Sequence, residues 1–114
     1  MSLGQKIAAR RQKQARVIDV PEWGEDGAPL QIHVYPITAG DWNKIQKKHK
    51  NFLNDMQIDG MVDLIILKAG DADGNRLFTL ADKTHLMDEP LPLISSIAAE
   101  MFADIEGIEV AEKN

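Results

Sequence analysis

The sequence DGMVDLIILK, residues 59–68, is the stretch on which the rest of the fold depends. Its apolar side chains point in nearly every direction around a helix, which is typical of a helix surrounded by other elements. We therefore predict a central buried helix that begins at Asp59 or Gly60 and ends at Leu67 or Lys68. Its apolar members are Met61, Val62, Leu64, Ile65, Ile66 and Leu67.

The segment before this central helix predicts an amphipathic helix from about Ala39 to Leu53. Thr38 and Asp41 have the spacing of a capping box, with Asp in place of the usual Glu. Steps of three and four then separate a packed face from a lysine-rich face. We interpret His49, on the packed face, as a core-edge histidine with a hydrogen-bond partner. The packed face comprises Trp42, Ile45, His49, Phe52 and Leu53.

Farther toward the N-terminus, the pattern predicts a two-stranded antiparallel hairpin. Residues 17–20 form a short β-prone run that Pro21 is expected to end, because proline has no N–H to donate to a ladder. Residues 22–29 are rich in turn formers, and residues 30–35 then alternate apolar and polar side chains. We expect the first strand at a sheet edge, and Trp23 as a local packing anchor. The hairpin must pack on helices or another strand, since isolated hairpins are marginal in water.

After the central helix, turn signals alternate with helix signals. Gly70 is placed to end the helix in a left-handed conformation, and residues 71–75 read as a tight turn. Thr79 with Asp82 predicts a second capping box, followed by a short helix to about Met87. Pro90 and Pro92 begin a last helix. Its apolar stripe consists of Ile94, Ile97, Ala98, Met101, Phe102 and Ile105.

These elements predict an α+β fold that is mainly α, with about four to five helices packed with a small antiparallel β-hairpin. The length of 114 residues allows one hydrophobic core. We divide the chain into a basic leading helix (1–16), a single globular domain (17–107) and a flexible acidic tail (108–114). The leading helix has a thin apolar stripe, so we expect it to fray unless a partner orders it.

The charge of the chain is divided unevenly along its length. The net charge is −5, but residues 1–18 carry five basic residues and no acid, so the remainder carries 8 basic and 18 acidic residues, a charge of −10. Such an acidic body disfavours general binding to nucleic acid. We interpret the basic segment as a solvated helix face that can also contact phosphate or an acidic protein surface.

Several classes of protein are excluded or disfavoured. The absence of cysteine removes disulfides, thiolate metal sites and cysteine nucleophiles, and is typical of a reducing cytoplasm. The longest apolar run has four residues, whereas a membrane-spanning helix needs about 20. We expect a cytoplasmic protein without a membrane partner.

Candidate chemistry is similarly sparse. Asp71, Asp73 and Asn75 match the start of a calcium loop, but Arg76 occupies the position that requires glycine. His33, His49 and His85 lie in different elements without ligand spacing. Neither a serine nucleophile motif nor a glycine-rich phosphate loop occurs. We predict no catalytic residue, no cofactor and no metal.

Three stretches, in order, resemble one known family. They are Val20–Gly24 after the basic helix, Val34–Asp41 leading into the lysine-rich helix, and Asp73–Thr79 before the last helices. In this order they resemble the tail assembly chaperones of long-tailed siphophages and their prophages, over almost the whole chain. Pro36-Ile37 and Glu106-Gly107 depart from the family's usual residues, which indicates a distant relative.

The resemblance implies a function and partners. Family members are non-enzymatic proteins that coat the tape measure protein in the host cytoplasm, keep it soluble and leave as tail tube subunits polymerise, so they are expected to be absent from the mature virion. In many relatives a ribosomal slip adds a domain that binds the tail tube (major tail) protein, and Lys113-Asn114 is where such a slip would fall here. Self-association is a further expectation.

The family supplies no motif residues with fixed roles, so the partner-binding residues are chosen for expected exposure alone. They are Arg10, Arg11, Ile105, Ile108 and Val110. Two alternatives stay open. One is a small DNA-associated regulator that uses the basic N-terminal helix, although the chain lacks a helix-turn-helix pattern around its lysine cluster. The other is a structural tail completion protein that remains in the particle.

Overall fold

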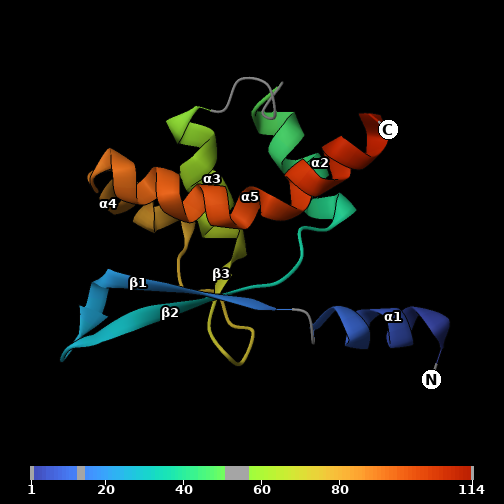
Figure 1. Ribbon diagram of the computed structural model, residues 1–114, viewed down its shortest axis with the longest axis horizontal. Coiled ribbons are helices and arrows are strands. Elements are labelled where there is room, and N and C mark those ends of the chain that lie inside the picture. Colours follow the sequence, from blue (N-terminus) through green and yellow to red (C-terminus); the bar gives the residue numbers. More distant parts are fainter. Residues whose placement is uncertain (1, 13–14, 51–56, 114) are drawn as a thin grey trace.

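A layer of helices covers one face of a three-stranded antiparallel sheet (Figure 1). The computed structural model describes the backbone of residues 2–12, 15–50 and 57–113, and the side chains of residues 2–11, 15–50 and 57–103. The strands are β1 (Arg16–Glu25), β2 (Ala28–Val34) and β3 (Ala69–Gly70), in the order β1-β2-β3. The predicted α+β class, mainly α with a small hairpin, is confirmed.

The helical layer follows the sequence pattern closely. It contains α2 (Ala39–Lys48), α3 (Ile58–Lys68), the short 3-10 turn η1 (Leu80–Asp82), α4 (Lys83–Met87) and α5 (Leu91–Lys113). Helix α1 (Leu3–Gln12) instead extends from the end of the sheet, away from that layer (Figure 1).

The central helix α3 is the core element that the sequence predicted. Val62, Leu64 and Ile65 are completely buried, and α5 packs across them with Ile97, Met101 and Phe102. The sheet supplies Val20, Ile32 and Val34 to the same cluster. Because almost every member is aliphatic, shape complementarity between Leu, Ile and Val side chains holds the two layers together.

The hairpin is longer than expected. β1 is an edge strand, as predicted, but it continues through Pro21 to Glu25, so the prediction that proline ends the strand was wrong. The pairing register shifts between Val20 and Glu25, and the missing proline N–H therefore falls where regular pairing is interrupted. The turn shrinks to Asp26 and Gly27, which both have positive φ.

The link from α3 to the sheet also differs from prediction. Gly70 was expected to be a left-handed cap, but it pairs with His33 in β3, and Ala69 before it is extended. In the described part of the chain the left-handed glycines are Gly27 and Gly74. Helix α3 thus leads directly into strand β3. The pairing of β3 with β2 is a tertiary contact that the local sequence pattern does not predict.

The helix boundaries agree with the capping signals. Thr38 and Asp41 form the predicted capping box, with both bonds at 3.0 Å. The box at Thr79 and Asp82 is also present and begins η1. Residues 51–53, predicted as the last turn of the second helix, lie outside the described part.

The last helix extends farther than predicted. The backbone of α5 remains helical to Lys113, past Gly107, whereas the sequence predicted a tail from residue 108. A single glycine costs a helix about 1 kcal/mol without ending it. The division of the chain at residues 16 and 107 stays a prediction.

Candidate functional site

Helix α1 presents both apolar and basic side chains to solvent. Leu3 and Ile7, one turn apart, are 73% and 52% exposed. Arg10 and Arg11, two of the predicted partner-binding residues, are exposed on the same helix. An exposed apolar pair beside cations is an arrangement that a protein partner with an acidic, amphipathic surface could cover.

The start of α1 carries a signal that the sequence reasoning missed. Ser2 and Gln5 bond reciprocally: the Gln5 N–H donates to Ser2 Oγ at 3.1 Å, and the Ser2 N–H donates to Gln5 Oε1 at 2.9 Å. This is the Ser-x-x-Gln form of the capping box. It fixes the beginning of a helix that has little apolar burial of its own.

The end of α1 approaches the sheet. Arg11 lines a surface hollow of about 270 Å³ together with Tyr35, Asp73 and Gly74. Asp71 closes the adjacent turn by accepting hydrogen bonds from the N–H groups of Asp73 and Asn75, each at 2.9 Å. These bonds lower the pKa of Asp71. The stretch that begins like a calcium loop is therefore a tight turn, as predicted.

The other three predicted partner-binding residues are Ile105, Ile108 and Val110. They belong to the helical backbone of α5, but their side chains lie outside the described residues. The structure therefore does not test whether they share a surface with Arg10 and Arg11.

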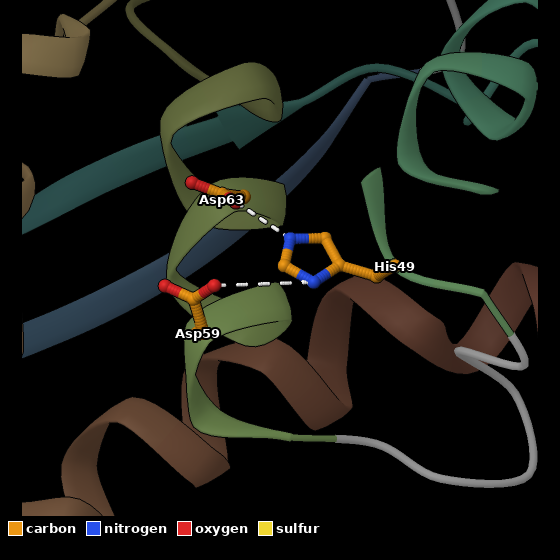
Figure 2. Close-up of side chains that lie close together, drawn as sticks. All are labelled: His49, Asp59 and Asp63. Carbon is orange, nitrogen blue, oxygen red and sulfur yellow. Dashed lines mark hydrogen bonds and ion pairs between the residues drawn. The ribbon is translucent and has the colours of Figure 1, made fainter. Parts of the chain in front are cut away.

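A cluster of ionisable side chains joins α2 to α3 (Figure 2). His49 Nε2 lies 2.6 Å from Asp63 Oδ2, and His49 Nδ1 lies 4.0 Å from Asp59 Oδ2. This contact confirms His49 as a core-edge histidine with a hydrogen-bond partner. Asp59 and Asp63 are four residues apart on α3, a spacing visible in the sequence, but only tertiary packing brings His49 to them.

Two lysines complete this cluster. Lys83 Nζ lies 2.5 Å from Asp59 Oδ1 and 3.1 Å from Asp63 Oδ1, and Lys48 Nζ lies 3.1 Å from Asp63 Oδ2. The imidazole and two carboxylates come close enough together to hold a metal ion. However, His49 directs a different ring nitrogen to each carboxylate, and ammonium groups already neutralise both. The arrangement is better suited to joining helices than to binding a metal.

The electrostatics of the cluster follow from these contacts. Burial acts to raise the pKa of Asp63, but hydrogen bonds from His49, Lys48 and Lys83 outweigh it, so the pKa is lowered. The pKa of Lys83 is raised, chiefly by its hydrogen bond to Asp59. The ionised forms of Asp63 and of Lys83 are therefore both favoured.

A second ion pair connects the opposite ends of the same helices. Lys68 Nζ donates to Asp41 Oδ2 at 2.7 Å and to the Pro36 carbonyl oxygen at 3.3 Å. Burial would raise the pKa of Asp41, but bonds from Lys68 and from the Thr38 N–H outweigh it and lower the pKa. The capping aspartate of α2 therefore also holds the end of α3.

Trp23 anchors the hairpin tip, as predicted. Its indole Nε1 donates to Glu89 Oε1 at 2.5 Å, and its ring meets Phe78 edge-on at a centroid distance of 5.7 Å. Glu89 and Phe78 lie just before α5 and η1, so this one side chain joins the sheet to the loops of the helical layer.

No protein-family model and no curated protein matches the sequence. Among solved structures, the chain is similar to the bacteriophage HK97 tail assembly chaperone, with a TM-score of 0.53 and 21% identity, over 89% of this chain and 92% of that chain. The chain has the fold of a phage tail assembly chaperone.

This likeness confirms the fold of the family that the sequence resembles. It covers nearly all of both chains, so it includes the sheet and the helical layer rather than one shared motif. Across the described helices, none combines the length and hydropathy that a bilayer crossing requires.

Proposed function

We propose that this protein is a non-enzymatic phage tail assembly chaperone that binds and solubilises the tape measure protein and helps to recruit tail tube subunits. The observation that carries the proposal is the fold, shared with the HK97 tail assembly chaperone over 89% of the chain. The ordered sequence motifs of Val20–Gly24, Val34–Asp41 and Asp73–Thr79 support it independently.

Physical chemistry supports this role for α1. A chaperone that coats an apolar protein needs exposed apolar side chains to bind it and net charge to keep the complex soluble. Leu3 and Ile7 supply exposed apolar surface. The charge of −10 beyond residue 18 supplies the repulsion between complexes.

The test is co-expression with the long, helix-rich tail protein encoded just downstream. We expect that protein to move from the insoluble to the soluble fraction and to co-purify with this chain. Failure of both, together with salt-sensitive DNA binding by this chain, would overturn the proposal and favour the DNA-associated regulator.

A charge reversal locates the contact on α1. Arg10→Glu with Arg11→Glu should reduce co-purification, whereas Lys47→Glu with Lys50→Glu changes the net charge equally on exposed positions of another segment and should not. Equal effects of the two double variants would show that only net charge matters.

Two further parts of the proposal have separate tests. An N-terminal tag on the native gene should reveal a minor, longer product if a slip at Lys113-Asn114 adds the domain that binds the tail tube protein. Mass spectrometry of purified particles should find no copy of this chain, because the proposed site of action is the host cytoplasm. Stoichiometric presence in the particle would instead favour a tail completion protein.

A further inference from the structure

A second surface feature lies between α2, α3 and η1. It is an open hollow of about 210 Å³ whose apolar lining comes from Ile45, Ile66, Leu67 and Leu80. Leu80, at the start of η1, is 66% exposed. Pockets that take small organic ligands begin at about 300 Å³, so this hollow has room for a single apolar side chain rather than for a cofactor.

The rim of the hollow is mainly basic, whereas the chain beyond residue 18 carries a net negative charge. Lys44, Lys48 and Arg76 line it, against one carboxylate, Asp63. Lys48 pairs with Asp63, whereas neither Lys44 nor Arg76 forms an ion pair with any side chain in the described ranges. Two exposed cations that lack a carboxylate partner among the described residues therefore lie beside an apolar lining.

We infer that this hollow, here called the basic hollow, binds an acidic segment of a partner protein that inserts one apolar side chain. This inference rests on the proposed function, because a chaperone must have a protein partner. The apolar side chain would cover the exposed Leu80 and the half-buried Leu67, and its flanking carboxylates would pair with Lys44 and Arg76. Arginine is well suited to this role because its planar group can hold a carboxylate with two hydrogen bonds.

The surrounding charge favours a peptide over a nucleic acid. A polyanion must approach a body of charge −10, and Asp63 lies in the lining of the hollow itself. A short segment needs only one or two carboxylates, and an apolar lining gives no advantage to phosphates. The basic hollow is therefore complementary to an apolar anchor with acidic neighbours.

Peptide binding followed by NMR tests the inference without the native partner. The probes are two alanine-based peptides of equal length with the same central leucine, flanked by glutamates in one and by lysines in the other. We expect the glutamate peptide to shift signals of Ile45, Ile66 and Leu80, and added salt to weaken this binding. Equal shifts by both peptides, or shifts elsewhere, would overturn the inference.

Substitutions identify the contacts. Lys44→Glu with Arg76→Glu should weaken binding of the glutamate peptide at least about tenfold, while Lys47→Glu with Lys50→Glu should change it less than about twofold. Leu80→Ser removes apolar lining from an exposed position and should also weaken binding. All three proteins must keep the wild-type urea midpoint. Equal weakening by the control pair contradicts the inference.

Co-expression separates this inference from the proposed function. If the wild type solubilises the downstream protein and Lys44→Glu with Arg76→Glu does so equally well, the basic hollow is not the contact although the function stands. If the wild type does not solubilise the downstream protein and still binds the glutamate peptide at the basic hollow, the proposed function is wrong and the inferred binding site stands. If the protein self-associates and Lys44→Glu with Arg76→Glu abolishes this self-association, the basic hollow binds a second copy of the chain, which contradicts the inference.

Discussion

At the scale of single residues, Asp63 accepts from more side chains than any other carboxylate in the described part of the chain. It is 9% exposed and accepts from His49 and Lys48 at the end of α2 and from Lys83 at the start of α4. A carboxylate that is nearly buried depends on such partners, because burial without them disfavours its ionised form.

We predict that Asp63→Asn lowers the free energy of unfolding by about 1–3 kcal/mol, since it removes charge-assisted hydrogen bonds from a nearly buried site. The measurement is urea unfolding near neutral pH. Asp59→Asn is the matched control: Asp59 is 52% exposed, and its loss should cost less than about 1 kcal/mol. Equal losses would show that burial of Asp63 contributes nothing.

The ion pair of Asp41 with Lys68 predicts a pH dependence of stability. The pKa of folded Asp41 lies below its ordinary value of 3.8, so its contribution is complete above that value and is lost as the pH falls through the folded pKa. The stability difference between wild type and Asp41→Asn should therefore be largest near about pH 6 and shrink below about pH 4. Urea midpoints across this range test it, and a constant difference would contradict it.

At the scale of elements, the hairpin depends on one glycine. A Cβ added at Gly24 would lie 1.8 Å from the carbonyl oxygen of Ala28, far inside van der Waals contact with backbone. The irregular pairing between Val20 and Glu25 brings the two strands this close. Glycine is required here because there is no room for a Cβ atom, and not because the backbone is left-handed.

We predict that Gly24→Ala destabilises the protein by about 2 kcal/mol or more, because backbone must move to make room. Gly4→Ala, in α1, is the control: its Cβ would meet nothing closer than 3.9 Å, and alanine is the better helix former. Thermal unfolding followed by circular dichroism compares them. A wild-type midpoint for Gly24→Ala would show that the strands can separate freely.

The elements also show how far a sequence determines its own structure. Helix starts at Thr38 and Thr79 were predicted because a capping box is a local signal between residues three positions apart. The pairing of Gly70 with His33 was missed because two residues of β3 carry no period of their own. The extension of β1 past Pro21 was missed for a related reason: only the partner strand shows that pairing is interrupted there.

The surface features also differ in whether the local sequence or only the packing of the chain determines them. Exposure of Arg10 and Arg11 could be predicted, because a polar helix with a thin apolar stripe has little to bury. The basic hollow could not be predicted, since Lys44 in α2 and Arg76 between β3 and η1 lie far apart in the sequence and line one hollow only in the folded chain. The same holds for His49 with Asp59 and Asp63.

At the scale of the whole molecule, the proposed contacts of α1 lie apart from the buried core. The buried cluster is built from the sheet, α2, α3, α4 and α5, whereas α1 contributes no member to the core among its described residues. The energy of folding and the proposed contacts of α1 can therefore be separated by truncation.

We predict that deleting residues 1–14 changes the free energy of unfolding by less than about 0.5 kcal/mol, because none of the described side chains of α1 belongs to the core. The deletion leaves Arg16, which donates to the Glu100 carbonyl oxygen at 2.7 Å. The same variant should fail to solubilise the downstream tail protein. Urea unfolding and co-expression measure the two effects, and a loss of stability above about 1 kcal/mol would show that α1 packs on the body.

The contact of Trp23 with Glu89 and Phe78 has a practical use in spectroscopy. The chain contains two tryptophans, and only Trp23 lies at the hairpin tip. Replacing Trp42 by phenylalanine would leave a single indole fluorophore at the seam between the sheet and the helical layer. Its emission would then report the parting of these layers in real time, during folding or when a partner binds.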